Sequence, residues 1–226
     1  MPPSRHWPSV FAAAALAAAA WAALDPAHGG LAVLLAALAV VAGGFAWLEY
    51  GVSSARDLTL VATLAGLAAA GRVLFAPVPG VQPVTVMVAA AGVALGPRRG
   101  FAVGAIAALV SNIFLGQGVH TPWQMLAWGG CGLLAGLVAP LLRQRVPFAA
   151  FCVVLGFAFG TLMDLWLWFT FYPHTGAALV AVLGAGVAFN VAHATGNLVL
   201  ALAVGPELRR VLERYARASR TEIVWA

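Results

Sequence analysis

Long apolar runs separated by short polar segments make up most of the chain. A membrane-spanning helix needs about 20 mostly apolar residues, and the runs recur at that length or slightly below it. Spans are expected at residues 9–24, 31–48, 57–75, 83–96, 100–116, 123–142, 148–171 and 177–205. The pattern predicts an all-α integral membrane protein.

The N-terminal run has two interpretations. Arg5 precedes it and Ala20-Trp21-Ala22 resembles a cleavage site, as in a signal peptide. The next apolar run follows after only a short turn, which favours a retained hairpin. We therefore expect a transmembrane helical hairpin over 1–54, a six-helix core over 55–206 and a basic tail over 207–226.

Composition supports the membrane assignment and limits the chemistry. Hydrophobic residues make up 63% of the 226 residues, charged residues only 8%, and the mean hydropathy is +0.96. Soluble domains carry about a quarter charged residues. All 12 basic residues are arginine, so the lysine of a phosphate-binding P-loop is missing and any ATP-driven work would have to be done by a partner. Cys131 and Cys152 lie in apolar runs, which argues against a disulfide framework or a zinc site.

The arginines predict the orientation. They fall in alternate connections, whereas the connections near 25–30, 76–82, 117–122 and 172–176 contain none. Under the positive-inside rule, these four connections lie outside and both termini are cytoplasmic, in a multi-pass protein of the cytoplasmic membrane. The basic tail and the net charge of +5 favour contact with anionic membrane lipid, and no nucleic acid partner is expected.

Two ionisable residues lie within predicted spans, where charges are costly and often functional. Arg72 is expected about one turn from the outer end of the third span, and Asp164 about two turns (~10 Å) below the outer end of the seventh. Their similar depth suggests an ion pair or a shared ligand contact. A buried pair that only fixes helix register is the alternative.

Polar and aromatic side chains gather at the predicted outer ends of the spans. This pattern favours an apolar cavity with a few polar contacts, although single tryptophans also serve as interfacial anchors. The candidate substrate-binding residues are Arg72, Gln82, Asn112, Gln117, Gln124, Asp164 and Trp168. A separate stripe of Asn190, His193 and Asn197 on the last span favours interhelical hydrogen bonding over a metal site or a proton relay.

Enzyme motifs are missing from the sequence. It contains no H-E-x-x-H helix and no G-x-S-x-G elbow, so neither catalytic residues nor metal ligands are assigned. No cofactor is expected to bind this chain. A substrate-binding or scaffolding role is favoured over catalysis.

The segment from 56 to about 205 resembles the substrate-specific S components of energy-coupling factor (ECF) transporters. The likeness rests on PGVQPVT at 79–85, GPRRG at 96–100 and the block from Ser111 to Met125, SNIFLGQGVHTPWQM. The resemblance implies a six-helix core that captures a vitamin or a metal ion from outside. It also implies a transmembrane (EcfT-like) coupling protein and two cytoplasmic ATPases as partners.

The resemblance suggests further details. The family's alanine-rich first core helix contacts the coupling protein, which maps onto Ala65 and Ala69 or, in the other register, Gly66 and Ala70. The TPWQM block looks most similar to S components for cobalamin or related corrinoids. Another vitamin, a metal ion, or a membrane scaffold without small-molecule transport are the alternatives. The two extra N-terminal helices depart from the six-helix pattern, and they would change the mechanism if they covered the coupling surface.

Overall fold

The computed structural model describes residues 7–22, 28–49 and 55–218, and within those ranges the regular secondary structure is all helical. The helices are α1 (Trp7–Ala22), α2 (Gly29–Glu49), α3 (Ala55–Phe75), α4 (Val84–Leu95), α5 (Pro97–Leu115), α6 (Thr121–Leu137), the short 3₁₀ helix η2 (Ala139–Leu142), α7 (Arg145–Phe171) and α8 (Gly176–Ala218). The predicted all-α class is confirmed.

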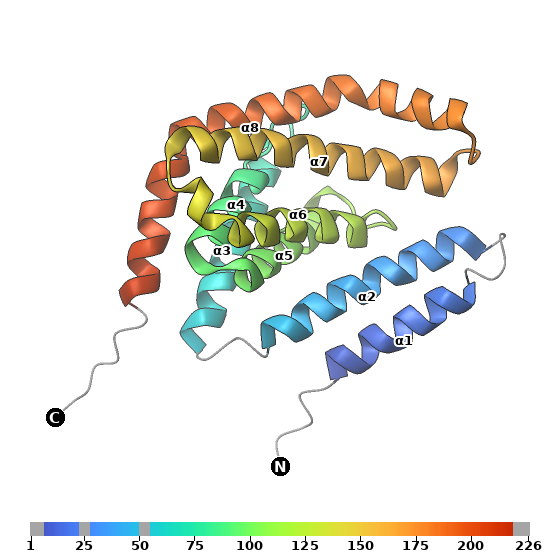
Figure 1. The fold of residues 1–226 in the computed structure, drawn as a ribbon, viewed down its shortest axis with the longest axis horizontal. Coiled ribbons are helices and arrows are strands. Elements are labelled where there is room, and N and C mark those ends of the chain that lie inside the picture. The colour runs from blue at the N-terminus through green and yellow to red at the C-terminus, as the bar shows by residue number, and fades with distance from the viewer. Residues whose placement is uncertain (1–6, 23–27, 50–54, 219–226) are drawn as a thin grey trace, which may run out of the picture.

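The helices form three groups (Figure 1). The hairpin α1–α2 lies on one side, α3 to α6 form the centre, and the pair α7–α8 lies on the other side. Among the described residues, α3, α5, α7 and α8 are long and apolar enough to cross a membrane, while α4 and parts of α1 and α2 are shorter apolar helices. These helices define a multi-pass membrane protein.

Prolines explain where the predicted spans and the observed helices differ. The span expected over 123–142 stops at Leu137 and continues as η2, which contains Pro140. In contrast, α8 continues through Pro206 to Ala218, and Figure 1 shows its last part turning away from the rest. Proline removes a helix hydrogen bond and bends or ends a helix. The basic tail expected from residue 207 therefore begins inside α8; residues 219–226 lie outside the described ranges.

The short helix α4 shapes the centre of the bundle. Its 12 residues rise only ~18 Å, which is less than the apolar core of a membrane. The preceding loop, 76–83, consequently packs against α8. A side chain at Gly80, which has a positive φ of 76°, would meet Ala192 and the backbone at Phe189.

Glycines allow α4, α5 and α6 to pack with their backbones in contact. A Cβ atom added to Gly132 would overlap the carbonyl oxygen of Gly100, and one added to Gly92 would overlap the carbonyl oxygen of Gly132. Small residues at helix crossings are a common means of association in membranes, where apolar side chains gain little by leaving lipid. The close packing in turn positions the polar ends of α5 and α6.

Substituting Gly132 by alanine is expected to lower the free energy of unfolding by about 1–3 kcal/mol, because the added methyl group forces α5 and α6 apart. Gly130 is the matched control, since it lies in the same helix and a Cβ there meets no atom within 4 Å. Unfolding of the two variants in mixed micelles measures the difference. Equal stability of Gly132→Ala and Gly130→Ala would show that the close backbone contact between α5 and α6 does not contribute to the free energy of unfolding.

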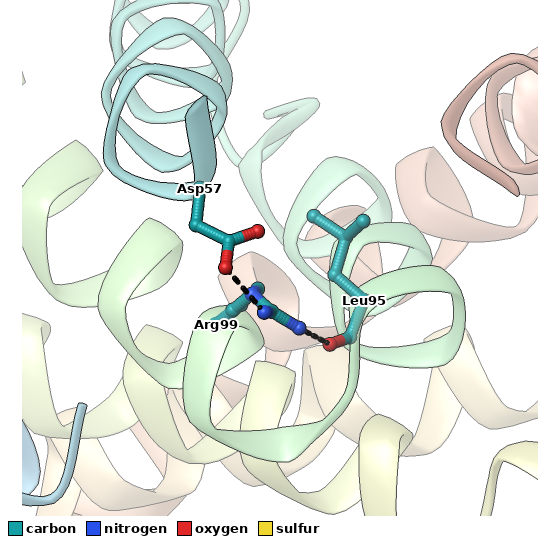
Figure 2. Close-up of polar contacts among 3 residues, drawn as sticks. All are labelled: Asp57, Leu95 and Arg99. Carbon is teal, nitrogen blue, oxygen red and sulfur yellow. Dashed lines mark hydrogen bonds and ion pairs between the residues drawn. The ribbon is translucent and has the colours of Figure 1, made fainter. Parts of the chain in front are cut away.

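Charged and aromatic side chains join the helices at the end of the bundle where α5 begins. Arg99 donates from Nη2 to Asp57 Oδ2 over 2.8 Å and from Nη1 to the carbonyl oxygen of Leu95 over 3.0 Å (Figure 2). The Arg98 guanidinium lies 4.9 Å from the centre of the Trp47 ring of α2. The GPRRG turn thus connects α2, α3, α4 and α5 at one point.

The N-terminal hairpin leaves one face of the core open. Helix α2 packs against α5 and α6, and α1 packs against α2. On α3, the side of Ala62, Gly66 and Ala70 is exposed, and a side chain at Gly66 would meet no atom within 4 Å. The extra helices therefore do not cover this face of α3.

Candidate functional site

Arg72 lies near the C-terminal end of α3 and bonds to two other helices. Its Nη1 donates to Ser111 Oγ over 2.7 Å and to Asn112 Oδ1 over 2.5 Å. Its Nη2 donates to Gln124 Oε1 on α6 over 3.4 Å. Arg72 is only 7% exposed, so this guanidinium ties α3 to α5 and α6 inside the bundle.

The groups that bond to this buried charge in the described part of the chain are neutral. Arg72 forms no salt bridge within the described part of the chain, its Cζ lies 4.7 Å from the centre of the Trp128 ring, and its Nε lacks a hydrogen-bond partner there. A buried charge without a counter-charge lowers stability, so such a residue is often kept for a function. Arg72 is thus a strong candidate for a functional residue.

Asn112 links the arginine to the loop between α5 and α6. Its Nδ2 donates to Thr121 Oγ1 over 3.0 Å and to Gln124 Oε1 over 2.8 Å. Thr121 Oγ1 donates to Gln117 Oε1 over 2.9 Å, and Gln117 Nε2 donates to the carbonyl oxygen of Leu109 over 2.9 Å. We call Arg72, Ser111, Asn112, Gln117, Thr121 and Gln124 the amide cluster.

A second buried network lies deeper in the bundle. Trp128 Nε1 donates to Thr85 Oγ1 over 3.1 Å, and Thr85 Oγ1 lies 3.1 Å from His193 Nε2. His193 Nδ1 lies 2.8 Å from the carbonyl oxygen of Gly80. Trp128 also stacks on Phe159, with ring centres 4.2 Å apart. This network joins α4, α6, α7, α8 and loop 76–83.

Polar residues of α7 and α8 bond to each other across that pair. Asn190 Nδ2 donates to Asp164 Oδ2 over 2.7 Å, and Asn197 Nδ2 donates to the carbonyl oxygen of Cys152 over 3.3 Å. With His193, these contacts confirm interhelical hydrogen bonding by the stripe on the last span. The suggested ion pair between Arg72 and Asp164 is wrong, because the two side chains bond to different helices and form no salt bridge.

The structure brings four of the seven sequence-predicted site residues together and leaves the other three apart. Arg72, Asn112, Gln117 and Gln124 meet in the amide cluster. Asp164 lies in the α7–α8 pair, and Trp168 donates from Nε1 to the carbonyl oxygen of Pro173, over 3.2 Å, at the C-terminal end of α7. Gln82 is half-buried in the loop before α4.

An apolar cavity of about 280 Å³ lies on a different face of α6 from the amide cluster. Trp123 lines it, whereas the next residue, Gln124, belongs to the cluster; successive helix residues point about 100° apart. We call this space the aromatic cavity. Its lining residues are Leu31, Leu34, Val119, Trp123, Trp166, Thr170 and Phe171.

Several residues of these networks were not singled out as site residues from the sequence. Ser111 and Thr121 join the amide cluster, and Trp128 places its ring against Arg72. Ser111 and Thr121 flank Asn112 and Gln124 in the same motif, so their proximity in sequence was an available signal. The sequence around Trp128 gave no such signal, because a buried tryptophan and an interfacial tryptophan cannot be told apart within an apolar run.

The four residues mapped to the coupling contact lie on two faces of α3. Ala65 and Ala69 are turned into the bundle, with exposures of 0% and 3%. Gly66 and Ala70 are exposed. Of the two registers that the sequence left open, only the one with Gly66 and Ala70 lies on a surface that a partner can reach without rearrangement of the bundle.

These features define a helical membrane protein with a polar cluster and an apolar aromatic cavity at one end, a form suited to binding an organic ligand. Residues 52–210 match the family model described as ECF-type riboflavin transporter, S component. The match covers more than half of the chain, and the chain belongs to this family. No curated protein and no solved structure matched it.

Family membership settles the general role. The protein is a substrate-binding membrane subunit of an ECF transporter and not an enzyme. S components work with a transmembrane coupling protein and with ATPases, so partners of this kind belong to its function. The match supports the S-component resemblance seen in the sequence but not the cobalamin-type branch.

Proposed function

We propose that this subunit binds riboflavin or a closely related flavin. The observation that carries the proposal is the position of the aromatic cavity and the amide cluster on two faces of α6, at Trp123 and Gln124. A flavin has a flat aromatic ring system with carbonyl and ring-nitrogen groups at one edge and a hydroxylated chain. The family's description as a riboflavin transporter component agrees with this chemistry.

The size of the cavity favours a flavin over a corrinoid. Ligand sites enclose most of the ligand surface, and a cavity of about 280 Å³ is at the small end for organic ligands. A corrin macrocycle with its side chains is much larger than a flavin ring system and would extend well beyond this half-open space. The similarity of the TPWQM block to corrinoid S components keeps cobalamin as the competing substrate.

The arginine distribution supports an outward-facing site. Arg98, Arg99, Arg143 and Arg145 lie at the opposite end of the helices from loop 116–120. Under the positive-inside rule, loop 116–120 and the two candidate sites then face outside, and both termini are cytoplasmic. The subunit binds its vitamin there, and ATP hydrolysis by the partner ATPases drives its release inward.

The absorption spectrum of the purified protein tests the substrate. Protein isolated from cells grown with both riboflavin and cobalamin is expected to carry the two near-visible bands of an oxidised flavin. Corrinoid bands would instead make cobalamin the substrate. A colourless protein that neither vitamin protects against thermal unfolding would favour a scaffold, because a ligand at 100 times its dissociation constant adds about 2.7 kcal/mol.

We also propose that the exposed face of α3 at Ala62, Gly66 and Ala70 binds the coupling protein. The face is open, small side chains allow close helix approach, and the hairpin α1–α2 packs elsewhere. Ala65 and Ala69 support the same helix from inside the bundle. This assigns the contact to one of the two registers that the sequence allowed.

Gly66→Leu is expected to reduce co-purification with the coupling protein and the ATPases at least about tenfold, which is 1.4 kcal/mol of lost contact. Vitamin binding by the isolated subunit should not change. Gly184→Leu is the matched control, because Gly184 also lies on an exposed helix face with no atom within 4 Å of an added Cβ. Normal assembly of Gly66→Leu would assign the contact to another face.

A further inference from the structure

The hairpin α1–α2 lies outside the segment that matches the family, residues 52–210, so the family gives it no role. One half of α2 is firmly attached to the core. Gly44 lies against the ring of Phe101, where any side chain would overlap the ring, and Trp47 lies against the Arg98 guanidinium. The half of α2 that ends at Glu49 is thus fixed to α5.

The other half of α2 borders the aromatic cavity. Leu31 and Leu34 line it from the hairpin, while Trp123 lines it from α6 and Trp166 and Phe171 line it from α7. The cavity is half-open, and Leu31 is 45% exposed. Without the hairpin, the side of this space opposite α7 would have no protein wall.

The chemistry of the lining indicates what fits there. None of the seven lining residues is charged, and the single aliphatic hydroxyl is that of Thr170. Trp166 and Phe171 meet edge to face, with ring centres 5.7 Å apart and planes at 90°. Aromatic rings of this kind pack well against a further flat ring, both by area and by ring electrostatics.

We infer that the N-terminal hairpin forms one wall of the substrate site, with Leu31 and Leu34 in contact with the planar ring system of the vitamin. This inference rests on the proposed function and adds a specificity-determining element that a six-helix core does not have. The ring lies between α2 and α7, and the polar groups of the ligand reach past Trp123 to the amide cluster.

A lipid acyl chain is the competing occupant of an apolar space in a membrane. The polar rim favours the vitamin. The His120 ring lies 6.0 Å from the Trp166 ring, and loop 116–120 carries Gln117 of the amide cluster two residues before Val119 of the lining. An acyl chain gains no hydrogen bonds from such a rim, whereas a ring with polar edges does.

Cysteine labelling tests the inference directly. In Leu34→Cys, saturating riboflavin is expected to slow modification by a maleimide at least about tenfold, because the bound ring covers the thiol. Trp21→Cys is the control: Trp21 is 71% exposed at the C-terminal end of α1 and does not line the cavity, so its labelling rate should not change. The natural Cys131 and Cys152 are buried and give little background.

Each outcome has a distinct meaning. If the unmodified protein fails to bind riboflavin, the proposed function fails before the hairpin is tested. If it binds riboflavin and Leu34→Cys still labels at an unchanged rate, the hairpin is not part of the site. If Leu34→Cys folds poorly, Leu34→Trp is used instead. The larger side chain fills the cavity and should weaken riboflavin binding at least about tenfold. Val40→Trp, on the exposed side of α2, should leave riboflavin binding unchanged. Equal affinity of the two tryptophan variants would overturn the inference.

Discussion

Replacing Asn112 with leucine is expected to lower the free energy of unfolding by about 3 kcal/mol, because hydrogen bonds to a charged group are worth about 1.5–3 kcal/mol and neutral partners are lost as well. Asn112 accepts from Arg72 and donates to Thr121 and Gln124. Its loss leaves the buried guanidinium with fewer acceptors. Unfolding in mixed micelles measures the effect.

A double-mutant cycle separates two contributions to this destabilisation: the loss of acceptors for the buried Arg72 charge and the simple loss of packing. In an Arg72→Met background no charge remains to be stranded, so Asn112→Leu should cost at least about 1 kcal/mol less than in the unmodified protein. Asn197→Leu is the control, because Asn197 is equally buried but makes one side-chain hydrogen bond among the described residues, to the carbonyl oxygen of Cys152. Strictly additive effects of Asn112→Leu and Arg72→Met would contradict an energetic role for the amide cluster.

Replacing Gln124 with glutamate is expected to stabilise the ligand-free protein and to weaken riboflavin binding at least about 30-fold, or about 2 kcal/mol. The new carboxylate supplies the counter-charge that Arg72 lacks, at the position where Gln124 Oε1 now accepts. It also removes the Nε2 group, which bonds to no other residue in the described part of the chain and is therefore available to a ligand carbonyl.

Thermal unfolding and riboflavin titration on the same preparation measure both effects. Gln144→Glu is the matched control, because Gln144 is exposed just before α7, at the opposite end of α6 from the amide cluster. It should change neither quantity appreciably. Unaltered riboflavin affinity in Gln124→Glu would remove Gln124 from the site, and lower stability would contradict the view that Arg72 lacks a counter-charge.

The helices and half of the candidate site followed from local sequence patterns. Apolar run length predicted each of the eight α-helices but not η2, and α6 begins two residues before the predicted start because Pro122 fits the first turn of a helix. Asn112, Gln117 and Gln124 meet because they flank one tight turn at Gly116, which has a φ of 106°. Such contacts depend on few residues and can be predicted without a tertiary structure.

Contacts between distant helices were harder to predict. Arg72 and Asp164 have opposite charges and similar predicted depths, but depth does not fix the direction in which each side chain points around its helix. Asp164 points to α8 at Gly186, where an added Cβ would overlap its carboxylate, and bonds to Asn190. The face of α3 that is open to the coupling protein also depends on how this helix is rotated about its axis. Packing against α4 and α5 determines that rotation, and the sequence does not show it.

The most direct test of substrate capture is an equilibrium titration of the detergent-purified protein with riboflavin, followed by quenching of flavin fluorescence. Stacking of the flavin ring on tryptophan in the aromatic cavity is expected to give saturable quenching with one site per chain and a dissociation constant below about 1 μM, or more than about 8 kcal/mol of binding. Cobalamin should not compete. Unquenched flavin at tens of micromolar protein, or full competition by cobalamin, would contradict the assignment of a flavin as the substrate.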